Sequence, residues 1–144
     1  GRKIYDSFMT GPEWAVELAH GYTYSAHPLA VAAGLATLDI YRDENLFARS
    51  ASLAPKFEAA MHDLADAPNA IDVRNVGLMG AVELAPRPGE PGKRGFDVFL
   101  QCFEDGLYLR TAGDSLAMSP PLTVTESEID EMTAILKNAI KKVG

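Results

Sequence analysis

Apolar residues change their spacing along the chain, and this change separates predicted helices from predicted strands. In residues 28–41 the apolar positions are dense around most of a helix, as expected for a helix buried between layers. In residues 45–68 they recur at about helical spacing, with Asn45 as a candidate cap and Pro55 as the expected site of a kink. These two segments are therefore predicted to be long helices.

Four short runs further along the chain have the spacing and composition of strands. These runs are residues 71–76, 79–84, 107–110 and 115–118. The first two form either two strands or one strand bent at Gly77 and Gly80. The last two flank a turn at 111–114 and predict a hairpin.

Two more helices are predicted in the same part of the chain. After a Pro- and Gly-rich loop at 86–95, an apolar stripe indicates a helix that ends at Gly106; it consists of Phe96, Phe99, Leu100 and Phe103. Thr125 to Glu128 has the pattern of a capping box and opens a final helix. The expected fold class is α/β, with a small α+β domain in which helices pack on a mostly antiparallel sheet.

Composition narrows the possible functions. The 144 residues are 47% hydrophobic, which is enough for one modest core, and the net charge of −7 comes without a basic stripe, so we expect no nucleic-acid partner. Cys102 is the single cysteine and there are three histidines, so neither a disulfide nor a zinc site is expected. No apolar run approaches the roughly 20 residues of a membrane helix, so we expect no membrane partner and a soluble protein of the reducing cytoplasm.

The most informative motif is His20-Gly21-Tyr22-Thr23-Tyr24-Ser25-Ala26-His27-Pro28, a turn that runs into a helix start. Backbone N–H groups at a helix N-terminus favour an anion, and a nearby hydroxyl can donate to a phosphate oxygen. By itself, a hydroxyl such as that of Thr23 in a turn more often serves the turn or the helix cap. Because the motif comes almost at once in a chain that begins at Gly1 without Met, we expect that upstream sequence is missing.

This segment resembles the corresponding segment of class III pyridoxal-phosphate aminotransferases, in particular the omega-amino acid (beta-alanine):pyruvate transaminases. The resemblance implies the C-terminal portion of a PLP-dependent transferase of fold type I. It assigns residues 1–27 to the end of the large cofactor-binding domain, 28–44 to a connecting helix and 45–144 to the small C-terminal domain. The family's Schiff-base lysine lies upstream of the segment that matches Gly1, so no catalytic residue is assigned here and the chain alone is expected to be inactive.

The resemblance also implies binding residues and partners. Thr23, with Tyr22 beside it, is expected to bind the phosphate of pyridoxal 5'-phosphate across a homodimer or larger homo-oligomer. Arg110 matches the arginine that grips the substrate carboxylate, for which a guanidinium provides two parallel hydrogen bonds. From the residues alone, a local ion pair between Arg110 and Asp114 is the commoner arrangement. The expected substrates are a small amino donor and a 2-oxo acid acceptor.

Other candidates carry less weight. Histidine is a common acid–base residue, which makes His20 and His27 candidates. Their places beside Gly21 and Pro28 favour structural hydrogen bonds over catalysis. Trp14 is an alternative pocket aromatic to Tyr22. Two further functions stay open: another class III enzyme, either a decarboxylase or an aminomutase, and a non-catalytic α+β interaction module.

Overall fold

Two units make up the part of the chain that the computed structural model describes, which is residues 1–12 and 21–144. They divide between Leu38 and Asp39, within one helix. The three-part division at residues 27 and 44 expected from the sequence stays a prediction.

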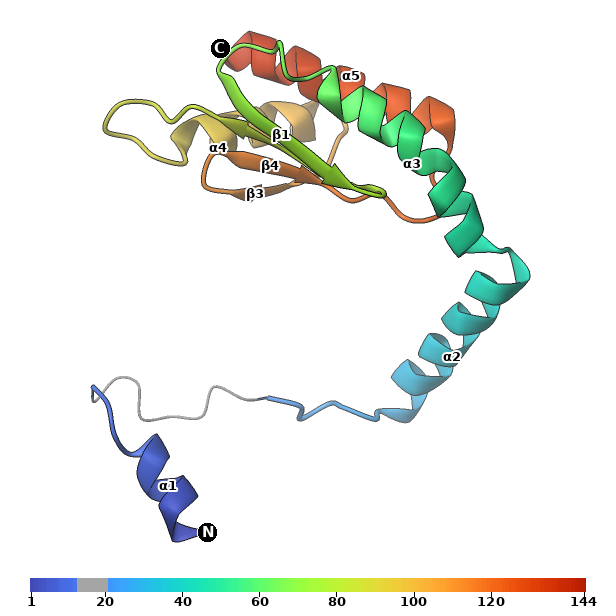
Figure 1. The fold of residues 1–144 in the computed structure, drawn as a ribbon, viewed down its shortest axis with the longest axis vertical. Coiled ribbons are helices and arrows are strands. Elements are labelled where there is room, and N and C mark those ends of the chain that lie inside the picture. The colour runs from blue at the N-terminus through green and yellow to red at the C-terminus, as the bar shows by residue number, and fades with distance from the viewer. Residues whose placement is uncertain (13–20) are drawn as a thin grey trace. The chain divides into compact units, whose positions relative to one another are not determined.

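The first unit holds α1 (Arg2–Phe8) and most of α2 (Pro28–Asp43) (Figure 1). Helix α2 begins and ends close to the predicted bounds, and Pro28 suits its first position because the missing N–H would have no intrahelical partner there. The expectation that this helix is buried is wrong for this chain, since none of its residues is buried. A helix buries its apolar face only against another layer; in the described residues Leu29 and Leu38 are 77% and 61% exposed.

The second unit contains a four-stranded sheet in the order β1-β2-β4-β3 (Figure 1). Its strands are β1 (Ala70–Val76), β2 (Met79–Leu84), β3 (Arg110–Ala112) and β4 (Ser115–Met118), and neighbouring strands are antiparallel. For residues 71–84 the sequence left two alternatives, and the structure has two strands instead of one bent strand. The chain turns between them at Gly77, which has a left-handed φ of 55°. The mostly antiparallel sheet predicted from the sequence is therefore confirmed.

The second hairpin is confirmed and its second strand has the predicted bounds, but its first strand is shifted. Its first strand begins at Arg110 and continues to Ala112, which pairs with Ser115, whereas the sequence predicted a strand that ends at Arg110. The turn falls on Gly113 and Asp114, because Gly113 adopts a φ of 61° at no steric cost. Arg110 thus lies at the start of an edge strand.

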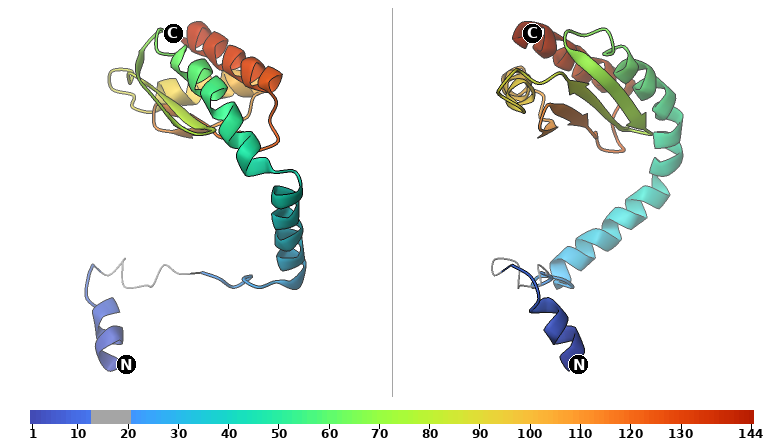
Figure 2. Two further views of the ribbon diagram at one scale, coloured as in Figure 1. Left: turned by 45° about the vertical axis from the view of Figure 1, so that its right-hand side comes forward. Right: turned by 60° about the vertical axis from the view of Figure 1, so that its left-hand side comes forward.

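Three helices accompany the sheet: α3 (Leu46–His62), α4 (Lys93–Glu104) and α5 (Glu126–Val143). Helices α3 and α4 both pack on strands, and α5 packs against both helices (Figure 2). One face of the sheet is buried in the resulting core, since Val82 and Leu116 pair directly and neither is exposed. The other face carries half-buried and exposed residues such as Arg74, Ala81 and Ala117.

Two details of helix α3 differ from the prediction. Helix α3 ends at His62, and tighter turns such as Leu64 N–H to Met61 O follow where the sequence predicted further helix. Asn45 stands at the cap position, but its side chain makes no capping hydrogen bond because its backbone is left-handed, with a φ of 51°.

Helix α4 departs from the prediction at its start and in its packing. It begins at Lys93, inside the predicted loop. Its buried side is formed by Gly95, Val98 and Cys102, while Phe96 and Phe103 of the predicted stripe are 50% and 59% exposed. The helix is therefore rotated so that its small residues approach the core.

Candidate functional site

Arg110 lies on the open face of the sheet, at one end of a row of directly paired residues. Arg110 pairs with Ala117, Ala117 with Ala81, and Ala81 with Arg74. Directly opposite residues of antiparallel strands project to the same face. The row therefore places an arginine on each outer strand with two small alanines between them.

The two arginines of this row differ in their partners. Arg74 forms ion pairs with Asp72 and with Glu83, the latter at 3.0 Å, and these carboxylates, Asp72 first, raise the pKa of its guanidinium further above its usual value. Within the described residues, the Arg110 guanidinium has neither a hydrogen bond nor an ion pair. Arg110 is exposed. Of this pair, Arg110 is the arginine whose donors are available to a ligand.

The local ion pair between Arg110 and Asp114, which the residue types alone favoured, does not form. The Asp114 carboxylate instead accepts hydrogen bonds from the backbone N–H groups of Gly92 at 2.6 Å and of Gly95 at 2.9 Å. Gly92 is the N-cap of α4 and has no side chain of its own to cap the helix. Sequence reasoning missed this role of Asp114; the signal was a predicted helix start without a capping side chain nearby.

A cavity of about 370 Å³ adjoins Arg110. Its lining comes from the segment before and at the start of β3, from the end of β4 with Ser119 to Pro121, and from Met132 of α5. Leu107 and Leu109 are buried, while Tyr108 is exposed on the same wall. Apolar residues form most of the lining, together with Arg110 and two hydroxyl-bearing residues, Tyr108 and Ser119. This combination is suited to a small ligand that carries a carboxylate.

The segment before α2 has unusual backbone geometry. Tyr22 and Ala26 both have positive φ angles, 127° and 62°, which non-glycine residues rarely adopt. Two turns follow each other, with Ser25 N–H donating to Tyr22 O and His27 N–H to Tyr24 O. Such strain in a short segment is typical of a binding loop.

The same segment satisfies the basic requirements of a phosphate site. Within the described residues the Thr23 hydroxyl has no hydrogen-bond partner, and the first turn of α2 carries no acidic side chain. The helix N-terminus adds N–H donors and partial positive charge. Tyr22 is 75% exposed. The residues present therefore fit a phosphate group.

The remaining candidates from the sequence are two histidines and Trp14. His27 is exposed, and its main chain takes part in the turn and in the first hydrogen bond of α2, from Val31 N–H to His27 O. Its structural role stays a prediction. His20 and Trp14 lie outside the described residues.

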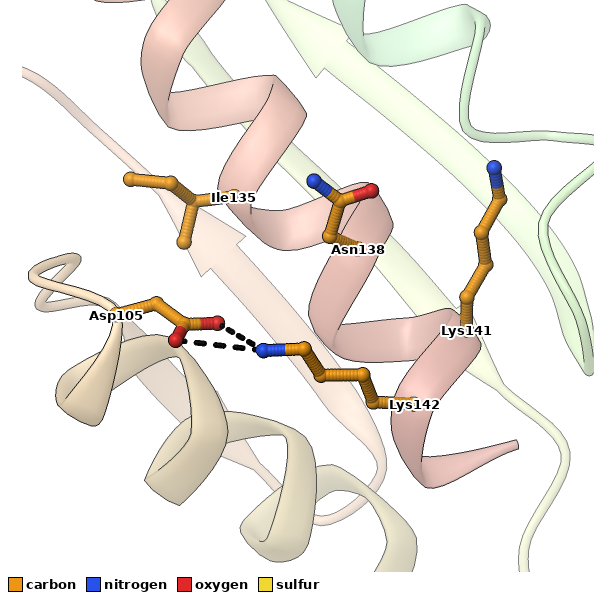
Figure 3. Close-up of a pocket in the computed structure, with 5 residues that line it drawn as sticks. All are labelled: Asp105, Ile135, Asn138, Lys141 and Lys142. Carbon is orange, nitrogen blue, oxygen red and sulfur yellow. Dashed lines mark hydrogen bonds and ion pairs between the residues drawn. The ribbon is translucent and has the colours of Figure 1, made fainter.

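Several lysines of this chain form ion pairs with carboxylates. Lys142 Nζ lies 2.9 Å from Asp105 in a hollow of about 390 Å³ between α4 and α5, and Figure 3 shows the Lys141 side chain pointing away from this pair. Lys56 and Lys137 also pair with aspartates. The expectation that none of this chain's lysines is the Schiff-base lysine stays a prediction.

The residues that the structure describes include neither a metal-binding cluster nor a membrane-spanning helix. No group of three or more His, Cys, Asp or Glu side chains there is placed to hold a metal ion. No helix in those ranges has both the length and the apolar character needed to cross a membrane.

Comparison with known proteins identifies the family. The model of the family Aminotransferase class-III matches residues 1–140, and the chain belongs to this family. The chain is 52% identical over 141 residues to an omega-aminotransferase of Caulobacter vibrioides, covering 98% of this chain and 32% of that protein. It is 46% identical over 144 residues to the beta-alanine–pyruvate aminotransferase of Pseudomonas aeruginosa, covering 99% and 32%.

The solved structures agree with the fold. The PMP-bound form of an aminotransferase from Vibrio fluvialis matches with a TM-score of 0.74 and 32% sequence identity, covering 88% of this chain and 29% of that one. The resemblance seen in the residues and the α/β fold of a transaminase are thus confirmed. The chain spans about a third of the length of the relatives that it matches.

Proposed function

We propose that this chain supplies substrate and cofactor contacts to a PLP-dependent aminotransferase that transfers an amino group from an omega-amino acid, such as beta-alanine, to pyruvate. The observation that carries the proposal is the Arg110 guanidinium, exposed beside a cavity of about 370 Å³ and without a partner in the described residues. The names of the relatives from Caulobacter vibrioides and Pseudomonas aeruginosa support the substrate class.

Arg110 has a defined task in this proposal. Its guanidinium holds the carboxylate of beta-alanine or of pyruvate through two parallel hydrogen bonds. That grip fixes one end of the substrate and directs the amino or keto end away from the sheet. Because the alanines beside it in the row are small, the carboxylate can approach the open face closely.

Thr23 and Tyr22 are proposed to hold the phosphate of pyridoxal 5'-phosphate. The support is the fit described above together with the PMP-bound form of the Vibrio fluvialis relative, since PMP is the aminated form of this cofactor. When bound, the cofactor accepts the electron pair released at the substrate carbon and stores the amino group. The phosphate contact anchors it against displacement during turnover.

The proposed enzyme is a homodimer or larger homo-oligomer in which Thr23 serves the neighbouring subunit's cofactor. Exposed apolar residues on α2, such as Leu35 at 58%, support an interface there. The Schiff-base lysine is proposed to lie outside this chain, in the part of the relatives that it does not span, so the 144 residues alone are expected to be inactive. The reducing cytoplasm is the proposed location.

The reaction itself is tested with the holoenzyme that contains this chain. Incubation with beta-alanine and pyruvate should yield alanine in step with the loss of pyruvate. Release of carbon dioxide from the donor, or an isomerised amino acid without use of pyruvate, would assign the enzyme to the decarboxylases or aminomutases instead. Absence of bound cofactor and of all three reactions would favour the interaction module.

The phosphate contact gives a separate prediction. Thr23→Ala removes one hydrogen bond to a charged group, so the dissociation constant of the cofactor should rise about tenfold to 100-fold. Equilibrium dialysis followed by the cofactor's absorbance measures it.

Thr37→Ala is the matched control for Thr23→Ala, because the Thr37 hydroxyl bonds Ala33 O within α2 at 2.9 Å. Equal cofactor retention in the two variants would remove Thr23 from the site.

A further inference from the structure

The turn of the β3–β4 hairpin is fastened to the start of helix α4 by one side chain. Asp114 accepts the N–H groups of Gly92 and Gly95 with its two carboxylate oxygens, at 2.6 and 2.9 Å. Its backbone oxygen accepts the N–H of Leu84 at 3.0 Å. This one residue thus connects the hairpin, helix α4 and the end of strand β2.

The backbones of helix and hairpin are also in direct contact at this point. A Cβ atom added at Gly95 would lie 2.5 Å from the Gly113 carbonyl oxygen and 2.8 Å from Asp114 Cα. Such contacts are too short for any side chain, so glycine is required for the close approach. We name this arrangement of Asp114, Gly92 and Gly95 the hairpin clasp.

The clasp acts on the strand that carries Arg110. Strand β3 is an edge strand that spans only Arg110–Ala112, and within the sheet it pairs with β4 alone. Strand β4 is held by its pairing with β2, whereas the direction of β3 depends on the turn and on its packing against α4. A bidentate guanidinium–carboxylate contact tolerates little displacement of either partner.

We propose that Asp114 is a positioning residue for Arg110: by clasping the hairpin to α4, it sets where the guanidinium meets the substrate carboxylate. This inference rests on the proposed function. Asp114 is assigned no contact with substrate or cofactor.

The test uses the holoenzyme and two amino donors, beta-alanine and 1-phenylethylamine, of which only the first has a carboxylate. Pyruvate is kept at a saturating concentration for every variant, because Arg110 is also proposed to hold its carboxylate. In Asp114→Ala the KM for beta-alanine should rise about tenfold to 100-fold, as expected for a misplaced binding group. The KM for 1-phenylethylamine and the kcat with either donor should change little. Asp114→Asn, which keeps one acceptor oxygen, should lie between this variant and the wild type.

Asp97→Asn is the matched control. Asp97 lies on the same helix, but its partners are Lys93 and Arg87, the latter at 2.5 Å, and not the hairpin. The variant loses both ion pairs near the same end of α4 and should keep the wild-type KM for both donors. If Asp114→Ala does not fold, the KM values of Asp114→Asn are compared with those of Asp97→Asn instead.

A double-variant cycle separates positioning from an independent effect. If Asp114 acts through Arg110, the combination of Asp114→Ala with Arg110→Ala should bind beta-alanine no worse than Arg110→Ala alone. Three outcomes would each overturn the inference. The first is a double variant whose KM for beta-alanine rises by the product of the two single effects. The others are an Asp114→Ala enzyme whose KM rises equally for both donors, and one whose KM values equal those of Asp97→Asn. If the wild type transfers no amino group, or Arg110→Ala leaves the KM for beta-alanine unchanged, the proposed function fails and this inference with it.

Discussion

At the scale of single residues, the same side chain has different uses according to its neighbours. Arg74 and Arg110 face the same side of the sheet, but Asp72 and Glu83 surround the first. The Arg74 guanidinium is engaged in local ion pairs, which at exposed sites contribute little to stability. Arg110 keeps its donors available, and this difference supports the substrate-binding role for Arg110.

Cys102 provides a prediction at the same scale. The thiol is fully buried in α4, and this burial, with a smaller contribution from Asp105, raises its pKa from 9.0 to about 11. Native protein should therefore react with a maleimide or disulfide reagent far more slowly than unfolded protein at neutral pH. Because the folded pKa is the higher one, the thiol's contribution to stability is present below pH 9.0 and lost as pH rises toward about 11.

The rate of thiol labelling, followed with and without denaturant, measures this protection. Equally fast labelling in both states would contradict the packing of α4.

At the scale of elements, helix α5 shows how completely a short motif can define a boundary. Glu128 N–H donates to the Thr125 hydroxyl at 3.3 Å, and Thr125 N–H donates to the Glu128 carboxylate at 2.7 Å. The backbone hydrogen bond from Thr125 is the main cause that holds the pKa of Glu128 below its usual value. The capping box predicted from the sequence is confirmed.

Removal of this cap should lower stability measurably. Thr125→Ala is expected to reduce the free energy of unfolding by about 1 kcal/mol, the typical cost of losing an N-cap. Thr123→Ala, at an exposed threonine before the helix, is the matched control. Urea titration of both variants measures the change, and equal stability of the two would show that the cap contributes nothing.

Other elements could be predicted only in part, for physical reasons. The capping box is local, so the sequence alone identified it. The end of strand β3 depends on which residue of the predicted turn adopts a left-handed φ. Gly113 does so, and the residues before it are free to extend the strand to Ala112. The rotation of α4 depends on a contact distant in sequence, the approach of Gly95 to Gly113, which no local pattern records.

At the scale of the whole molecule, the site could be named from the sequence only through the family. Taken alone, Thr23 is a hydroxyl in a turn and Arg110 is an arginine at the end of a strand, and neither indicates a binding site. Their proposed roles came from the resemblance of the motif around Tyr22 to the family. Helix α2 exposes the apolar residues that the sequence pattern predicted to be buried. The apolar pattern of α2 indicates that another layer covers this helix. The described residues do not provide that layer.

The measurement that tests the central claim most directly compares two arginine variants of the holoenzyme. Arg110→Ala should raise the KM for beta-alanine about 100-fold, because hydrogen bonds to charged groups contribute about 1.5–3 kcal/mol each and tenfold in affinity corresponds to about 1.4 kcal/mol. At saturating pyruvate, the KM for 1-phenylethylamine should stay within about twofold of the wild type. Arg74→Ala should leave both values unchanged, since Arg74 is paired within the sheet. An Arg110→Ala enzyme that treats both donors as the wild type does would contradict the account.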